Sequence, residues 1–215
     1  MNLSIKQKWI LLGIIGVLAI SLFIGNIKVL YFNKDKNNSS PIEYVKEAEL
    51  RYWECKSQLV NEVQNYIESV APTSNLRGYN LVQASEKYDI DVKFMLAQAH
   101  IESHFGTKGL ARKTNSVWNV LAYDSLSYDK ISKKGKFPHP NASIEPYCEL
   151  LINNYLVNKS EHDLMEHFIN KHNKRYASDP NYESRLRDQY QVIKTDTKID
   201  SLQDRLLYYK VRALR

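Results

Sequence analysis

The segment from Phe94 to Gly106 places the strongest constraint on the fold, because its ends and its interior all favour one short helix. Asp91, just before it, is a residue type that caps helix N-termini, and the glycine at its end is a common helix terminator. Met95, Ala99 and Glu102 are spaced at i, i+4 and i+7, so they share one face of this helix. The sequence predicts a helix whose apolar face ends in a glutamate.

The carboxyl group of Glu102 is the candidate catalytic group of this helix. On an apolar face it is partly desolvated, and in the last helical turn the negative end of the helix dipole also disfavours its charged form. Both effects predict a raised pKa for Glu102. A carboxyl group that stays protonated near neutral pH can act as a general acid, as one does in glycoside hydrolysis. The alternative is a solvated glutamate at a helix end, with no catalytic role.

The histidines beside Glu102 raise the question of a metal site. His100 and His104 have the i, i+4 spacing of helical zinc ligands. In the metalloprotease signature the glutamate directly follows the first histidine, whereas Ile101 stands there in this chain. The other histidines have no partner at a metal-binding spacing: His139, His162, His167 and His172. We therefore predict no metal and no other cofactor.

The N-terminal residues predict a membrane anchor. Residues 9–27 contain no charged side chain, and their length is close to the ~20 residues that cross a bilayer core. No small-residue cleavage site follows them, which favours an uncleaved transmembrane anchor over residues 1–27 rather than a cleaved signal peptide. Lysines lie on both sides of the apolar stretch and leave its orientation open. Residues 28–41 are polar and rich in turn formers, which predicts a short linker.

The rest of the chain is long enough for one domain. About 170 residues follow the linker, which allows one core and not two. Apolar residues at helical spacing predict a packing helix over residues 42–72 and a helical tail over residues 194–215. The tail could pack on the domain, join another subunit or lie on a membrane, and we favour packing. Residues 73–193 form the candidate catalytic domain.

Net charge limits the classes of partner only loosely. The chain has 30 basic and 24 acidic residues, a formal charge of +6. This balance favours an anionic partner such as nucleic acid, acidic lipid or a wall polymer. The basic side chains are scattered and no nucleic-acid-binding motif accompanies them, so we predict no nucleic acid partner.

Two cysteines, Cys55 and Cys148, are too few for a disulfide framework. The sequence leaves open whether they form one disulfide or are two buried thiols.

A second informative segment runs from Arg175 to Tyr182. Asp179 and Pro180 are suited to the cap and the first turn of a helix that Tyr182 continues. This structural interpretation does not explain Tyr176, which precedes the cap.

Together the two segments resemble the glucosaminidase domain of glycoside hydrolase family 73, the bacterial and phage N-acetylglucosaminidases. Residues 97–106 are similar to the family segment AQAxxESx(W/F)G, residues 175–182 are similar to YATDPNY, and the similarity spans roughly residues 76–193. The resemblance implies a lysozyme-like α+β fold that is mainly helical, with a short β-hairpin lobe. It also implies cleavage of peptidoglycan glycan strands, with Glu102 as the acid and Tyr176 beside it in the cleft.

The resemblance also identifies candidate residues of the cleft wall. In the family, a segment similar to residues 115–120 reads NN-L-F-G-I; Asn115 and Trp118 fit it in type, while Ser116 and Asn119 depart from it. Asn115 is therefore a candidate sugar contact. Trp118 and Tyr123 could stack on sugar rings, and core packing is the alternative for each.

The second catalytic group is less defined. Residues 125–140 have the character of a short hairpin, where family members usually carry a glutamate. This chain offers Asp124, Asp129 and Glu145, of which we favour Asp124 because it directly follows Tyr123. The acetamido group of the substrate could instead act as the nucleophile.

The sequence therefore predicts a membrane-anchored, single-pass peptidoglycan hydrolase with its domain on the periplasmic or extracellular side. The predicted partners are the glycan strands and, through the N-terminal helix, the membrane. Two alternatives stay open: a muramidase or lytic transglycosylase using the same glutamate, or a catalytically idle wall-binding protein of a larger wall-penetrating or phage assembly.

Overall fold

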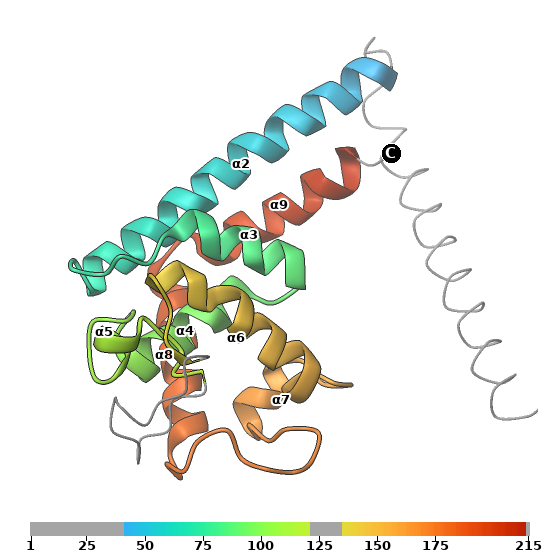
Figure 1. The fold of residues 1–215 in the computed structure, drawn as a ribbon. Helices are drawn as coiled ribbons and strands as arrows, with labels where there is room; N and C mark the ends of the chain where they lie inside the picture. Colours follow the sequence, from blue (N-terminus) through green and yellow to red (C-terminus); the bar gives the residue numbers. More distant parts are fainter. Residues whose placement is uncertain (1–40, 121–134, 214–215) are drawn as a thin grey trace, which may run out of the picture. The chain divides into compact units, whose positions relative to one another are not determined.

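The computed structural model describes residues 41–120 and 135–213, which fold almost entirely into helices (Figure 1). A 3-10 turn, η3 (Pro140–Ser143), precedes helix α6 (Ile144–Leu150), and a π-helical turn, η4 (Leu151–Tyr155), continues it. Within these two ranges the β pairing consists of one isolated bridge between Ile169 and Arg175. The prediction of a mainly α-helical fold is confirmed for the described residues. The helices in chain order are α2 (Pro41–Val70), α3 (Gly78–Tyr88), α4 (Val92–Ser103), α5 (Ala111–Thr114), α6 (Ile144–Leu150), α7 (Glu161–Glu166), α8 (Tyr182–Asp196) and α9 (Ile199–Ala213).

Two predicted elements fall on residues that the structure does not describe. The transmembrane anchor lies within residues 1–40, and most of the predicted hairpin lies within residues 121–134. In the described ranges, no helix combines the length and the apolar character needed to cross a bilayer.

Helix α4 forms the centre of the core and packs against α8 and α3. Every residue from Val92 to Ala99 is buried, so the helix is enclosed on all sides rather than along the single apolar face that we predicted. Between Val92 and Ala99, two of the buried side chains are polar, and both have partners. Lys93 Nζ lies 2.8 Å from Asp200 Oδ1, and Gln98 bonds to two tyrosine hydroxyls. Because residues 92–99 are enclosed, the partly buried last turn that follows them is held in a fixed position.

Helix α2 packs on the domain through only some of its apolar residues. Its buried residues include Leu59, Val63 and Ile67, whereas Leu50 and Trp53 are 66% and 61% exposed. The close approach of α3 to α2 depends on Gly78, because a Cβ there would lie 2.8 Å from two backbone atoms of α2. The backbone N–H of Gly78 also donates to Gln64 Oε1 at 2.8 Å.

Helix α9 packs against the same core. Ile199, Leu202 and Leu206 are buried, and the Cys55 thiol on α2 donates to the Leu202 carbonyl at 3.3 Å. Cys55 and Cys148 are both buried and free, so two thiols and not a disulfide are present. Residues 45–215 form one compact unit.

Candidate active site

Glu102 lies in the last turn of α4, and the residues after it explain its placement. The helix ends at Ser103, three residues before the glycine that we expected to end it. His104 and Phe105 already adopt left-handed conformations, with φ of 51° and 57°. Ser103 fixes this end of the helix, because its Oγ donates to the Val117 carbonyl at 2.6 Å and accepts from the Gly106 N–H at 2.8 Å. Glu102 is half-buried beside this junction.

Hydrogen-bond donors from two other segments hold the Glu102 carboxyl group. The Tyr182 hydroxyl, at the start of α8, donates to Oε1 at 2.6 Å. Asn119 Nδ2, from the segment after α5, donates to Oε2 at 3.0 Å and to the Glu102 carbonyl at 3.1 Å. Both carboxyl oxygens are therefore bound, which restricts rotation of the group.

A buried chain of hydrogen bonds leads to Tyr182. The Tyr147 hydroxyl donates to Gln98 Oε1 at 2.6 Å, and Gln98 Nε2 donates to the Tyr182 hydroxyl at 3.0 Å. Burial raises the pKa of Tyr182, and the negative charge of Glu102 raises it further. Burial likewise raises the pKa of Tyr147. Both phenols therefore keep their protons and act as donors. Because Tyr182 already accepts from Gln98, its own proton points to Glu102.

Tyr176, the tyrosine singled out by the sequence, lies next to this chain of hydrogen bonds and interacts with Gln98. Its hydroxyl donates to the Trp118 carbonyl at 3.0 Å, and its ring stacks on Phe168 with centroids 4.5 Å apart. Burial raises the pKa of the Tyr176 phenol, and the negative charge of Glu102 raises it further. The direct contact with Glu102, however, is made by Tyr182, which the sequence analysis had interpreted only as a helix residue.

The turn before α8 brings Tyr182 to this position. Asp179 does not cap the helix directly as predicted, because α8 begins at Tyr182. Asp179 Oδ1 instead accepts from the Asn181 N–H at 2.9 Å, and its Oδ2 lies 2.9 Å from Arg185 Nη1. This turn sets Tyr182 at the first position of α8, facing the end of α4.

The other predicted site residues do not gather around Glu102 in the part of the chain that the structure describes. Trp118 has no exposed surface, stacks on Tyr147 and donates to the Met95 carbonyl, which favours the core-packing alternative over sugar stacking. Asn115 Nδ2 donates to the Phe137 carbonyl at 2.9 Å and so connects two chain segments. Tyr123, Asp124 and Asp129 lie outside the described residues, whereas Glu145 is exposed and pairs with Lys87 at 2.6 Å.

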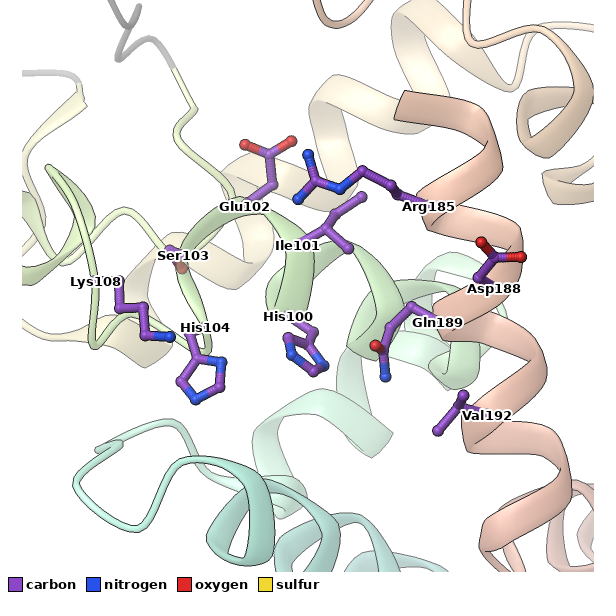
Figure 2. Close-up of a pocket in the computed structure, with 10 residues that line it drawn as sticks. All are labelled: His100, Ile101, Glu102, Ser103, His104, Lys108, Arg185, Asp188, Gln189 and Val192. Carbon is purple, nitrogen blue, oxygen red and sulfur yellow. The ribbon is translucent and has the colours of Figure 1, made fainter. Parts of the chain in front are cut away.

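A hollow of about 480 Å³ adjoins the end of α4. Figure 2 shows Glu102 and Arg185 on one side of this helix end and His100 and His104 on the other. Burial lowers the pKa of His100, with a further contribution from His104, which favours neutral His100 near pH 7. Among the described residues, no group of three His, Cys, Asp or Glu side chains could hold a metal ion. The hollow is lined by His100, Ile101, Glu102, Ser103, His104, Lys108, Arg185, Asp188, Gln189 and Val192.

The enclosed helix, the carboxyl group at its end and the surrounding phenols define a helical domain with a candidate general acid. Comparison with known families identifies the family to which this domain belongs. Residues 78–195 match the family Glucosaminidase, described as mannosyl-glycoprotein endo-beta-N-acetylglucosaminidase. This match covers more than half of the 215 residues, so the chain belongs to the glucosaminidase family, and the predicted resemblance is confirmed. A comparison with curated proteins found no match.

Proposed function

We propose that this chain is a peptidoglycan hydrolase of the endo-β-N-acetylglucosaminidase type, with Glu102 as its general acid. The main support is the setting of Glu102, at the end of an enclosed helix within the matched residues 78–195, with donors on both carboxyl oxygens. Membership of the glucosaminidase family suggests glycoside hydrolase chemistry and a peptidoglycan substrate.

In the proposed reaction, Glu102 transfers its proton to the glycosidic oxygen while the bond from that oxygen to the anomeric carbon breaks. Positive charge develops on the sugar ring as this bond breaks, and the oxygen of a water molecule then adds to the anomeric carbon while one proton of that water passes to a carboxylate. Tyr182 and Asn119 orient the carboxyl group through the bonds described above. Tyr176 is our candidate for an assisting residue, because its ring lies 5.5 Å from the ring of Tyr182.

The group that acts on the anomeric carbon is a separate proposal. Asp124 is our candidate carboxylate for activating water or stabilising the charged ring, with Tyr123 beside it as a sugar contact. The acetamido group of the substrate is the alternative nucleophile. Asn115 is a weaker candidate for binding sugar, since its amide already binds the Phe137 carbonyl.

Zymography on peptidoglycan tests the role of Glu102. We expect wild-type protein to clear the gel and Glu102→Gln to lose activity by about 10²- to 10⁴-fold, since general acid catalysis typically contributes this much. Glu149→Gln is a matched control, because Glu149 is exposed on α6. Equal clearing by wild type and Glu102→Gln would exclude Glu102 as the acid. Absence of clearing by wild type would favour the idle, wall-binding alternative.

Mass spectrometry of the released fragments identifies the bond that is cut. New reducing ends on N-acetylglucosamine support the proposed specificity. Reducing or anhydro ends on N-acetylmuramic acid would instead assign the chain as a muramidase or lytic transglycosylase that uses the same glutamate.

We also propose that residues 9–27 anchor the chain in a membrane, with residues 45–215 on the side where the wall lies. The support is the uncharged, apolar composition of the segment and its length. Under this arrangement the chain acts on glycan strands close to the membrane, alone or within a larger wall-penetrating or phage assembly.

A further inference from the structure

Asn119 has a backbone conformation that few residue types adopt. Its φ is 51°, in the left-handed region where glycine is at ease and asparagine is among the better-tolerated alternatives. The glucosaminidase segment that residues 115–120 resemble has glycine at this position. The chain thus keeps the conformation that glycine allows and adds a side chain to it.

That side chain reaches the Glu102 carboxyl group. Both atoms near the amide nitrogen are acceptors, namely Glu102 Oε2 at 3.0 Å and the Glu102 carbonyl at 3.1 Å. This fixes the orientation of the amide, because a flipped Asn119 would bring its own oxygen against two oxygens. The bond to the carbonyl also satisfies one of the acceptors that the end of α4 leaves free.

The oxygen of the Asn119 amide argues against a purely structural role for this side chain. Asn119 Oδ1 is buried and, among the described residues, has no hydrogen-bond partner. A buried, unsatisfied carbonyl lowers stability, so the side chain is poorly explained by a role in folding alone. Its favourable polar contacts are both with Glu102.

We propose that Asn119 is a positioning residue for the general acid, which restrains the Glu102 carboxyl in one orientation and stabilises its charged form. The catalytic part of this inference rests on the proposed function, whereas the effect on the carboxyl group does not. Glycine at the same position would leave the backbone unchanged and Oε2 without this donor.

Several titratable or charged groups lie close to the Glu102 carboxyl group. Tyr147, Tyr176 and Tyr182 all have a raised pKa to which the charge of Glu102 contributes, so they stay neutral between pH 4 and 9. Arg185 points toward Glu102 in Figure 2. The other charged or titratable groups that line the hollow are Asp188 on α8 and, on the opposite side of the helix end, His100, His104 and Lys108.

The test is the titration of the Glu102 side chain in full-length protein, followed by NMR of ¹³C-labelled carboxyl groups and assigned with Glu102→Gln. Replacing Asn119 by glycine keeps the left-handed backbone and removes the donor. We expect the Glu102 midpoint to rise by about one pH unit in Asn119→Gly, since a donor to the charged form is lost. Asn119→Asp, which cannot donate and adds negative charge, should raise the Glu102 midpoint further.

The matched control is Asn158→Gly. Asn158 is an exposed asparagine with φ of 57°, so its replacement should not change the Glu102 midpoint.

Thermal unfolding and kinetics complete the test. The melting temperature of Asn119→Gly should stay close to that of wild type, because the unsatisfied carbonyl is removed together with the bond to the Glu102 carbonyl. On peptidoglycan, kcat should fall about 10-fold with KM unchanged, and the alkaline limb of the rate profile should move up with the carboxyl midpoint. An unchanged midpoint in Asn119→Gly, or an equal shift in Asn158→Gly, overturns the proposal. Wild type that titrates as expected but does not cut peptidoglycan refutes the proposed function and leaves the positioning of Glu102 in place.

Discussion

At the scale of single residues, the catalytic proposal depends on the bonds that Glu102 accepts. A donor to a carboxyl oxygen favours the charged form, whereas enclosure favours the neutral form. Tyr182 is the more buried of the two donors and stands at the end of a chain of bonds from Tyr147 through Gln98. The protonation of Glu102 is therefore set by elements far from it in the sequence.

Replacing Tyr182 by phenylalanine should separate these effects. We expect kcat/KM to fall about 10-fold, the lower end for loss of a hydrogen bond to a charged group of about 1.5–3 kcal/mol. The alkaline limb of the pH–rate profile should move to higher pH, because the neutral acid persists longer once this donor is gone. The profile of kcat/KM against pH measures both.

Tyr190→Phe is the matched control for Tyr182→Phe. Tyr190 also donates to a carboxylate, Asp91 Oδ2 at 2.7 Å, but at the opposite end of α4. Its loss should lower the melting temperature and leave the pH profile in place. An alkaline limb that does not move in Tyr182→Phe would mean that this phenol does not influence the acid.

The sequence was sufficient to find Glu102 but not its partners. A glutamate at the end of a capped apolar segment is a local pattern, and so is a family motif. Tyr182 lies 80 residues away, and its local role as the first residue of a helix hid the contact. Asn119 did carry a signal, since asparagine in place of glycine suggests a left-handed backbone, but the target of its amide depends on tertiary structure. A tryptophan such as Trp118 is equally common in a sugar-binding cleft and in a hydrophobic core, so the tertiary structure is needed to distinguish the two.

At the scale of helices, local signals gave the elements and missed some of their ends. Helix α2 begins at Pro41, the last residue of the predicted linker, and ends at Val70, two residues before the predicted end of the packing helix. Helix α8 starts three residues after Asp179 because that side chain stabilises a turn instead of a cap. The extent to which α4 is enclosed also depends on α8, which lies far along the chain and contacts it most closely.

The contact between α2 and α3 gives a prediction at this scale. Gly78→Ala should destabilise the domain by about 1–3 kcal/mol, the usual cost of inserting a methyl group into a packed interface. The new Cβ would lie 2.8 Å from the Val60 carbonyl oxygen and the Gln64 nitrogen, which are backbone atoms that cannot rotate away. Urea unfolding measures the loss.

Gly109→Ala is the comparison, since a Cβ there meets no atom within 4 Å and the cost arises from its φ of 61° alone. A Gly78→Ala protein as stable as wild type would show that α2 and α3 can separate without penalty.

At the scale of the whole molecule, the family match covers the middle of a larger structural unit. Helices α2 and α9 lie outside residues 78–195, yet Leu59 and Leu202 belong to the same core cluster as the residues of α4. The packing helix and the tail are therefore parts of one folded body, residues 45–215, which the proposed anchor would hold at a membrane.

The anchor proposal can be tested on the intact chain. We expect full-length protein to sediment with membranes and to resist extraction by alkaline carbonate, because residues 9–27 carry no charge. Ile15→Lys with Leu22→Lys keeps the length and should release the protein, since each central lysine costs about 2.5–3.5 kcal/mol in a bilayer. Fractionation followed by immunoblotting measures the distribution of both proteins.

Orientation requires a second measurement, because lysines flank the apolar stretch on both sides. Protease added outside spheroplasts should digest residues 45–215 if the domain faces the wall, while a cytoplasmic marker stays intact. If carbonate extracts the wild-type protein as completely as the double-lysine variant, the anchor proposal is wrong. A domain that stays protected outside and becomes sensitive only after lysis would place Glu102 on the side of the membrane where no glycan strand can reach it, and the hydrolase would then need another route to its substrate.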